Sequence, residues 1–171
     1  MHAQKAQEQQ WLFRYLEDHF LGATGGVRAF QAAARTWAGT EHEKTLTRLH
    51  GEIKAERLEL RRSLRAQGHR PNAAKMAFAH VSATAARINP LNVRRSTRGP
   101  GAQLELEALQ SLVRGKQALW ETLLALLDAG WTFSGYDRQR LNELAERAQG
   151  QQREVAAIMT STAAHRFGFR P

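Results

Sequence analysis

The chain has 171 residues, of which 42% are hydrophobic and 24% charged, so we expect one globular domain over residues 1–171. The absence of cysteine excludes disulfides, thiolate metal sites and a cysteine nucleophile, and it fits a reducing compartment. No apolar run reaches the ~18 residues of a membrane span, and the N-terminus is no signal peptide, so we expect a cytoplasmic protein. The formal charge of +9 permits contact with anionic surfaces.

Two long amphipathic helices are predicted for the first part of the chain, over residues 4–38 and 40–67. In both segments apolar side chains recur at three- and four-residue steps, which is the period of a helix that buries one face. Gly39 lies between them as a C-terminal stop signal. Thr40 and Glu43 have the spacing of a capping box, so we expect each side chain to bond to the backbone amide of the other residue.

Two adjacent glycines, Gly25 and Gly26, interrupt the apolar stripe of the first helix. A glycine within a helix costs about 1 kcal/mol relative to alanine, so this pair needs a physical reason. We interpret the pair as a place where another helix packs closely or where the helix kinks mildly. Room for a ligand is the alternative interpretation.

A long connection separates the second long helix from the third. Residues 73–87 are rich in alanine and predict a short helix, which the following Asn-Pro pair ends. An irregular stretch follows, and its Gly99-Pro100-Gly101 segment predicts a break before the next helix. Because the connection is too long for a hairpin, we expect the third long helix to begin at the far end of a crossover-type four-helix bundle.

The last two long helices are predicted over residues 102–129 and 135–165, and the short aromatic link between them indicates an antiparallel pair. We expect Ser134 to be the N-cap of the final helix. We also expect Phe167 and Phe169 to fold back onto the bundle. The third long helix has the most apolar stripe of the chain, formed by Leu109, Leu112, Leu119, Leu123 and Leu126.

Charged residues interrupt two of these apolar stripes. Glu105 and Lys116 fall within the stripe of the third long helix, and Glu56 falls within that of the second. A buried ammonium is more stable beside a carboxylate than alone, so we expect an internal Lys116–Glu56 ion pair between the two helices. We expect Gly115 to let a neighbouring backbone approach, and Glu105 to pair with an arginine near its helix start. The alternative is that Lys116 bends out to solvent.

The pattern of a carboxylate-bridged di-iron centre is missing from this sequence. Such a centre needs a glutamate on each of two helices and a Glu-x-x-His pair on each of the other two. No glutamate of the chain has a histidine three residues later. We therefore expect neither a metal nor a cofactor. An unconventional metal site made by His19, Glu52 and Glu56 is the alternative interpretation.

The remaining motifs do not predict catalysis. The sequence contains no Gly-rich phosphate loop, no nucleophile elbow and no zinc pattern. It does contain a candidate anion-binding patch, although this patch lacks the interleaved aromatic residues that stack on bases. Binding of nucleic acid or another anionic surface through basic patches is therefore an alternative hypothesis. The patch consists of Arg87, Arg94, Arg95 and Arg98.

Several segments carry a family resemblance: FRYLEDHFLGATGGVRAF, the Gly-His-Arg-Pro link before the alanine-rich segment, and LELEALQSLVRGKQALW. In these segments and in the order of its helices, the chain resembles a group of uncharacterised bacterial, mainly actinobacterial, ferritin-like bundle proteins. The resemblance covers nearly the whole chain, from Trp11 to Ala164. It implies an all-α, ferritin-like four-helix bundle with an extra short helix in the crossover. It implies no established activity, because the ligand pattern of the metal-using ferritin-like proteins is absent.

The leading hypothesis from the sequence is a small, non-catalytic interaction or stress-associated protein without a di-iron site. We expect a homodimer formed through a helical face. A degenerate metal site and the binding of nucleic acid or another anionic surface are the two alternatives.

Overall fold

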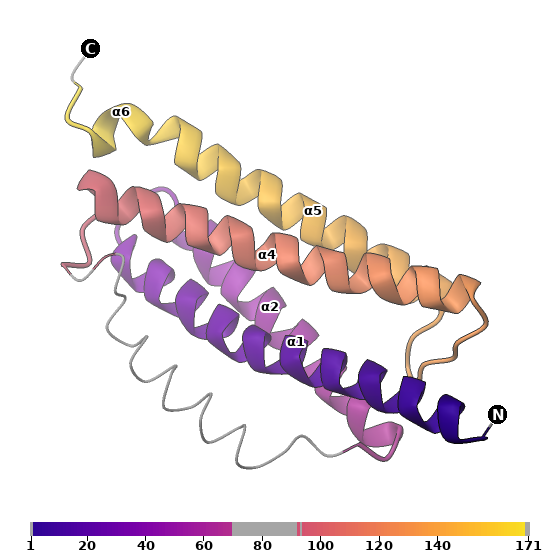
Figure 1. Cartoon of the computed structure of the whole chain (residues 1–171). Coiled ribbons are helices and arrows are strands. Elements are labelled where there is room, and N and C mark those ends of the chain that lie inside the picture. The colour runs from indigo at the N-terminus through magenta and orange to yellow at the C-terminus, as the bar shows by residue number, and fades with distance from the viewer. Residues whose placement is uncertain (1, 70–91, 93, 170–171) are drawn as a thin grey trace.

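The computed structural model describes residues 2–69, 92 and 94–169 (Figure 1). The described part of the chain forms helices and no strand, which confirms the all-α prediction. None of these helices is long and apolar enough to cross a membrane. The short helix predicted over residues 73–87 lies outside the described residues. The described helices are α1 (His2–Thr36), α2 (Glu43–Ala66), α4 (Gly99–Asp128), α5 (Arg138–Ser161) and the short α6 (Ala163–Arg166).

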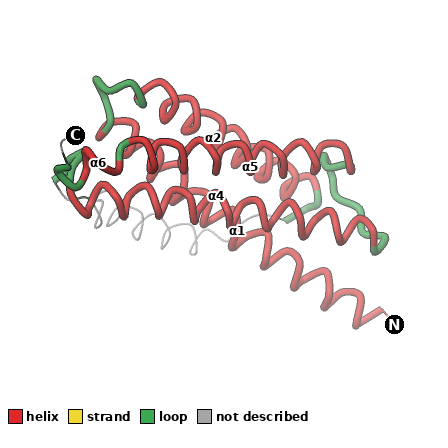
Figure 2. Tube along the Cα trace, turned by 90° about the horizontal axis from the view of Figure 1, so that it is seen from above, coloured by secondary structure: helices red, strands yellow, loops and turns green. Residues whose placement is uncertain are grey.

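The four long helices pack together as two antiparallel pairs (Figure 1 and Figure 2). Helix α1 packs against α2, α4 packs against α5, and α1 also contacts α4. The end of α2 and the start of α4 lie at opposite ends of the bundle (Figure 1). The chain between these two helices therefore leaves α2 at one end of the bundle and enters α4 at the other.

Large apolar side chains from all four long helices fill the space between them. Two tryptophans and two phenylalanines are almost completely buried, and leucines from α2, α4 and α5 surround them. Burial of such side chains is the main favourable contribution to folding. The four aromatic residues are Phe20, Phe30, Trp37 and Trp120.

The position of Leu112 corrects the predicted apolar stripe of α4. Leu112 is 39% exposed, whereas Val113 is only 1% exposed. Val113 follows the buried Leu109 by four residues and stays on its face of the helix, whereas Leu112 falls at the edge of that face. Leu104 and Leu112 are therefore the large apolar side chains that α4 exposes.

The start of α2 differs from the predicted capping box. The helix begins at Glu43, and its N-cap His42 makes no side-chain capping bond. The Thr40 hydroxyl accepts a hydrogen bond from the amide of His42 at 3.3 Å, and the Glu43 carboxylate accepts one from the amide of Gly39 at 2.7 Å. The Thr40–Glu43 prediction was wrong because a turn over residues 40–42 moves both acceptors onto other amides.

Asp137, and not the predicted Ser134, is the N-cap of α5. Its carboxylate accepts a hydrogen bond from the backbone amide of Arg140 at 2.7 Å. Phe133 and Tyr136 are both buried and pair with each other through their backbones. This pairing holds residues 133–136 in a turn, so the helix cannot begin before it.

The start of α4 also differs from the prediction. Gly99 and Pro100 form its first turn, so the predicted break at this position was wrong. Proline lacks an amide hydrogen, but the first turn of a helix offers no acceptor for that hydrogen, so proline is tolerated there.

The C-terminal phenylalanines do not fold back onto the bundle, contrary to the prediction. Phe167 is 53% exposed and Phe169 is 76% exposed. The buried residue of α6 is Arg166 instead. Its guanidinium donates hydrogen bonds to Gln103 of α4 and to Thr162, so polar contacts fix this end of the described chain.

Candidate functional site

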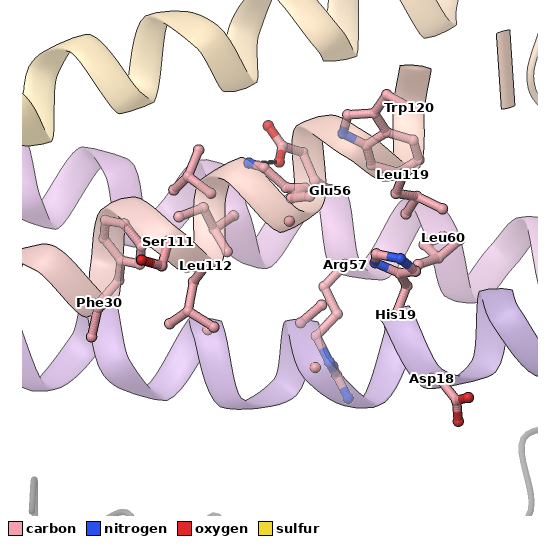
Figure 3. A pocket seen from close by; sticks show the side chains of 18 of the residues that line it. Asp18, His19, Phe30, Glu56, Arg57, Leu60, Ser111, Leu112, Leu119 and Trp120 are labelled. Atoms are coloured by element: carbon pink, nitrogen blue, oxygen red, sulfur yellow. Dashed lines mark hydrogen bonds and ion pairs between the residues drawn. The ribbon is translucent and has the colours of Figure 1, made fainter. Parts of the chain in front are cut away.

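Three polar side chains meet near the middle of α2, α4 and α5, and we call them the central cluster: Glu56, Lys116 and Gln151. The ammonium of Lys116 donates hydrogen bonds to the Glu56 carboxylate and to the side-chain oxygen of Gln151. The amide nitrogen of Gln151 donates to the second Glu56 oxygen at 3.2 Å. Glu56 and Gln151 are each 1% exposed, and the Lys116 side chain is 13% exposed. The dashed line in Figure 3 marks the Lys116–Glu56 contact.

Further charged side chains of α2 and α5 lie next to the central cluster. Gln151 also donates to Glu52 at 2.9 Å, and Arg48 donates to the same carboxylate at 2.6 Å. Arg48 pairs in addition with Glu154 of α5. Arg147 of α5 lies 4.0 Å from Glu56. The central cluster and these charged side chains therefore join α2, α4 and α5 through hydrogen bonds and ion pairs.

The environment changes the proton affinity of two of these side chains. Burial lowers the pKa of Lys116 below its ordinary value, and the nearby Glu56 charge offsets part of this effect. Burial acts to raise the pKa of Glu52, but the hydrogen bonds from Gln151 and Arg48 outweigh it and lower that pKa. The ionised Glu52 therefore stabilises the fold above the pKa that it has in the unfolded chain. This contribution is lost as the pH falls through the lowered pKa of the folded state.

The candidate metal ligands His19, Glu52 and Glu56 do not come together. The described part of the chain contains no group of three His, Asp or Glu residues that could hold a metal ion. Glu52 and Glu56 each accept hydrogen bonds from Gln151 and from a cation, which is Arg48 for Glu52 and Lys116 for Glu56. His19 lies on α1, and its ring makes a T-shaped contact with that of Tyr15 at a centroid distance of 4.6 Å. Burial lowers the pKa of His19, against the opposing charge of Asp18.

A cavity of about 690 Å³ lies between α1, α2 and α4, next to the central cluster (Figure 3). Glu56 and Lys116 border it on one side, and His19 borders it from α1. Most of its wall is apolar, including Phe30, Ile53, Leu60, Val113 and Leu119.

The glycines of α1 and α4 form part of this wall. Gly22, Gly26 and Gly115 line the cavity. Among the described residues, no atom lies within 4 Å of the position that a Cβ would take at these glycines or at Gly25. The predicted close packing at Gly25, Gly26 and Gly115 is therefore not found against the described residues, and against the rest of the chain it stays a prediction. Gly26 of this pair lines the cavity, and the alternative interpretation of the pair, room for a ligand, stays a prediction.

The structure describes three of the four arginines of the predicted anion-binding patch. Arg94, Arg95 and Arg98 are exposed in the segment before α4, and Arg87 lies outside the described residues. Glu105 is buried, and it accepts a hydrogen bond at 2.9 Å from Asn92, which the sequence did not suggest as a partner. The exposed arginines can therefore meet an anion from solvent, while Asn92 links their segment to α4.

No protein-family model matches this sequence, and neither a curated protein nor a solved structure matches it. A function can therefore be inferred for this chain only from its own geometry and charges. Two features provide that information, namely the central cluster and the cavity beside it.

Proposed function

We propose that this chain is a ferritin-like four-helix bundle that acts by non-catalytic interaction with another molecule, without a di-iron centre. The position of the Lys116 ammonium, between Glu56 and Gln151, carries this proposal. Ferritin-like di-iron proteins direct carboxylates and histidines from four helices toward the centre of the bundle. In this chain an ammonium and an amide occupy positions near the middle of their helices and bond to the carboxylate there.

Two physical effects oppose a metal ion in the central cluster. The Lys116 ammonium repels a cation and has no lone pair with which to ligate one. Both Glu56 oxygens already accept hydrogen bonds, from Lys116 and from Gln151. A metal ion would have to displace these bonds and leave a buried ammonium without its partner, which is unfavourable.

Metal loading tests the proposal directly. We expect protein that is incubated with Fe(II), Mn(II) or Zn(II) and then dialysed to retain less than one equivalent of each metal, as measured by elemental mass spectrometry. We expect Glu56→Ala to retain no less metal than the wild type. The matched control is Glu146→Ala, because Glu146 is an exposed glutamate on α5. A stoichiometric metal that is lost in Glu56→Ala and kept in Glu146→Ala would establish a metal site and reject the proposal.

The interaction partner that we propose for assembly is a second copy of this chain. Leu104 and Leu112 are 45% and 39% exposed on α4, and they supply an apolar contact for such a homodimer. The stress-associated role stays a prediction from the sequence.

A second candidate function is binding to an anionic surface such as nucleic acid. The formal charge of +9 and the exposure of Arg94, Arg95 and Arg98 favour it. Contacts between arginine and phosphate release counterions, so such binding weakens steeply as salt is added. Neutralising the three arginines to glutamine should reduce the slope of log affinity against log salt by about one for each phosphate that the variant no longer neutralises.

Fluorescence anisotropy with a short labelled duplex measures this slope. The control is a variant with the same loss of charge at three exposed arginines elsewhere, which should keep the wild-type slope. Equal slopes in the wild type and in both triple variants would show that the predicted patch does not bind the duplex. The control arginines are Arg35, Arg114 and Arg153.

A further inference from the structure

The α1/α2/α4 cavity has the size and lining of a small-molecule site. Its volume is about 690 Å³, within the range of roughly 300–1,000 Å³ that is typical of ligand pockets. Tyr15 and Ala23 of α1 and Leu112 of α4 provide accessible apolar surface, and the buried Ile53 and Leu119 lie behind it. Such a wall favours a ligand with an apolar body, because binding removes apolar surface of both partners from water.

The glycines in the wall create space that alanine would begin to fill. Glycine destabilises a helix relative to alanine. Gly22, Gly26 and Gly115 nevertheless line the cavity, and no described atom lies within 4 Å of a Cβ position at any of them. Close packing against another described helix therefore does not account for these three residues.

Arg57 places a cation at the wall of this cavity. Its Nε donates to the Thr24 hydroxyl at 2.9 Å, and its guanidinium lies over the ring of Phe20, 4.5 Å from the centroid. Among the described residues, no carboxylate forms an ion pair with Arg57. Burial lowers the pKa of Arg57, and the nearby charges of Arg61 and Arg28 lower it further.

The other titratable groups of the wall do not cancel this charge. Glu56 is neutralised by Lys116. Asp18 also borders the cavity, but it is exposed to solvent and its carboxylate forms no ion pair with Arg57. His19 faces the cavity in Figure 3, and burial lowers its pKa, which favours the uncharged ring. Among the described residues, the mostly apolar wall of the cavity therefore includes a cation, Arg57, that forms no ion pair with a carboxylate.

We propose that the α1/α2/α4 cavity binds a small amphipathic carboxylate, with the apolar chain against the glycine-lined wall and the carboxylate on Arg57. A guanidinium can donate two parallel hydrogen bonds to a carboxylate, which favours this head group over a neutral or cationic one. This inference goes beyond the proposed function and does not depend on it. A metal bound in the central cluster would reject the proposed function, but it would leave Arg57 and the glycines of the cavity unchanged.

Calorimetric titration with octanoate, octanol and octylammonium tests the head group. These probes share one apolar chain and differ in charge. We expect octanoate to bind with a stoichiometry of one and with the highest affinity. Arg57→Met should weaken octanoate binding about tenfold or more and remove its advantage over octanol. Arg65→Met is the matched control, because Arg65 is an exposed arginine further along α2 and does not line the cavity.

Two adjacent glycines allow a matched test of the cavity itself. Gly26→Leu places a side chain in the cavity, and it should abolish octanoate binding. Gly25→Leu makes the same substitution at a position that does not line the cavity, and it should keep the wild-type affinity. Thermal unfolding followed by circular dichroism verifies that both variants fold. Gly115→Leu blocks the cavity from α4 if Gly26→Leu fails to fold.

Several outcomes would overturn the inference. These are the absence of octanoate binding, binding that Gly26→Leu and Gly115→Leu leave unchanged, or tighter binding of octylammonium than of octanoate. A wild-type dimer that becomes monomeric in Gly26→Leu would assign the cavity to a second copy of the chain and would equally reject a small carboxylate.

Discussion

Replacing Lys116 with methionine is expected to lower the free energy of unfolding by about 3–5 kcal/mol. Methionine keeps an apolar stem but removes the ammonium that faces Glu56. Glu56 is 1% exposed, so the variant leaves a charged carboxylate where water scarcely reaches it. The single hydrogen bond from Gln151 to Glu56 compensates for only part of this loss. Urea unfolding at pH 7, followed by circular dichroism, measures the effect.

Two further variants make this test specific. The double variant Lys116→Met/Glu56→Leu removes both charges, and we expect its stability to equal or exceed that of the wild type. Arg114→Met breaks an exposed ion pair with Glu121 on the same helix, so its effect should stay below about 1 kcal/mol. A double variant as unstable as Lys116→Met would contradict a buried ion pair, and so would a destabilisation in Lys116→Met no larger than in Arg114→Met.

Trp120→Ala is expected to lower the free energy of unfolding by about 3–5 kcal/mol, and Trp120→Phe by much less. Trp120 is 1% exposed, and its ring packs against that of Tyr136 with centroids 5.6 Å apart. Alanine would enlarge the empty space beside α4, because Trp120 also borders the cavity. Phenylalanine keeps an aromatic ring there. The indole nitrogen that it removes has no hydrogen-bond partner in the described structure, so no bond is broken.

Trp11→Ala is the control for the Trp120 variants. Trp11 is 59% exposed, so its truncation should change the free energy of unfolding by less than about 0.5 kcal/mol. Guanidinium unfolding of the three variants and the wild type under the same conditions gives the comparison. Equal destabilisation by Trp120→Phe and Trp120→Ala would show that the indole nitrogen makes a hydrogen bond that contributes to stability, contrary to the structure.

The helical period of the apolar residues was sufficient to predict the all-α fold. This period is a local property, since a helix places residues three and four apart on one face wherever it lies in the molecule. The same property showed that Lys116 and Glu56 interrupt apolar stripes. It could not show that Leu112 lies at the edge of its stripe, because the partner helices determine which part of a broad stripe is covered.

The helix starts were harder to predict, because several neighbouring side chains can accept the same free amides. Thr40 and Glu43 have the spacing of a capping box, yet they bond to the amides of His42 and Gly39. Ser134 is a good N-cap residue, but burial of its two aromatic neighbours in the core holds this segment in a turn. Packing therefore selected among caps that local propensity treats as equivalent.

The sequence by itself determined that the chain forms long amphipathic helices and which charges must be accommodated between them. Only the tertiary structure decided that Gln151 completes the central cluster and that Arg57 borders an open cavity. The sequence around a glycine such as Gly26 does not show whether a neighbouring helix packs against it or leaves a cavity there. The separation and rotation of the helix axes distinguish the two cases, and these depend on contacts between residues far apart in the chain.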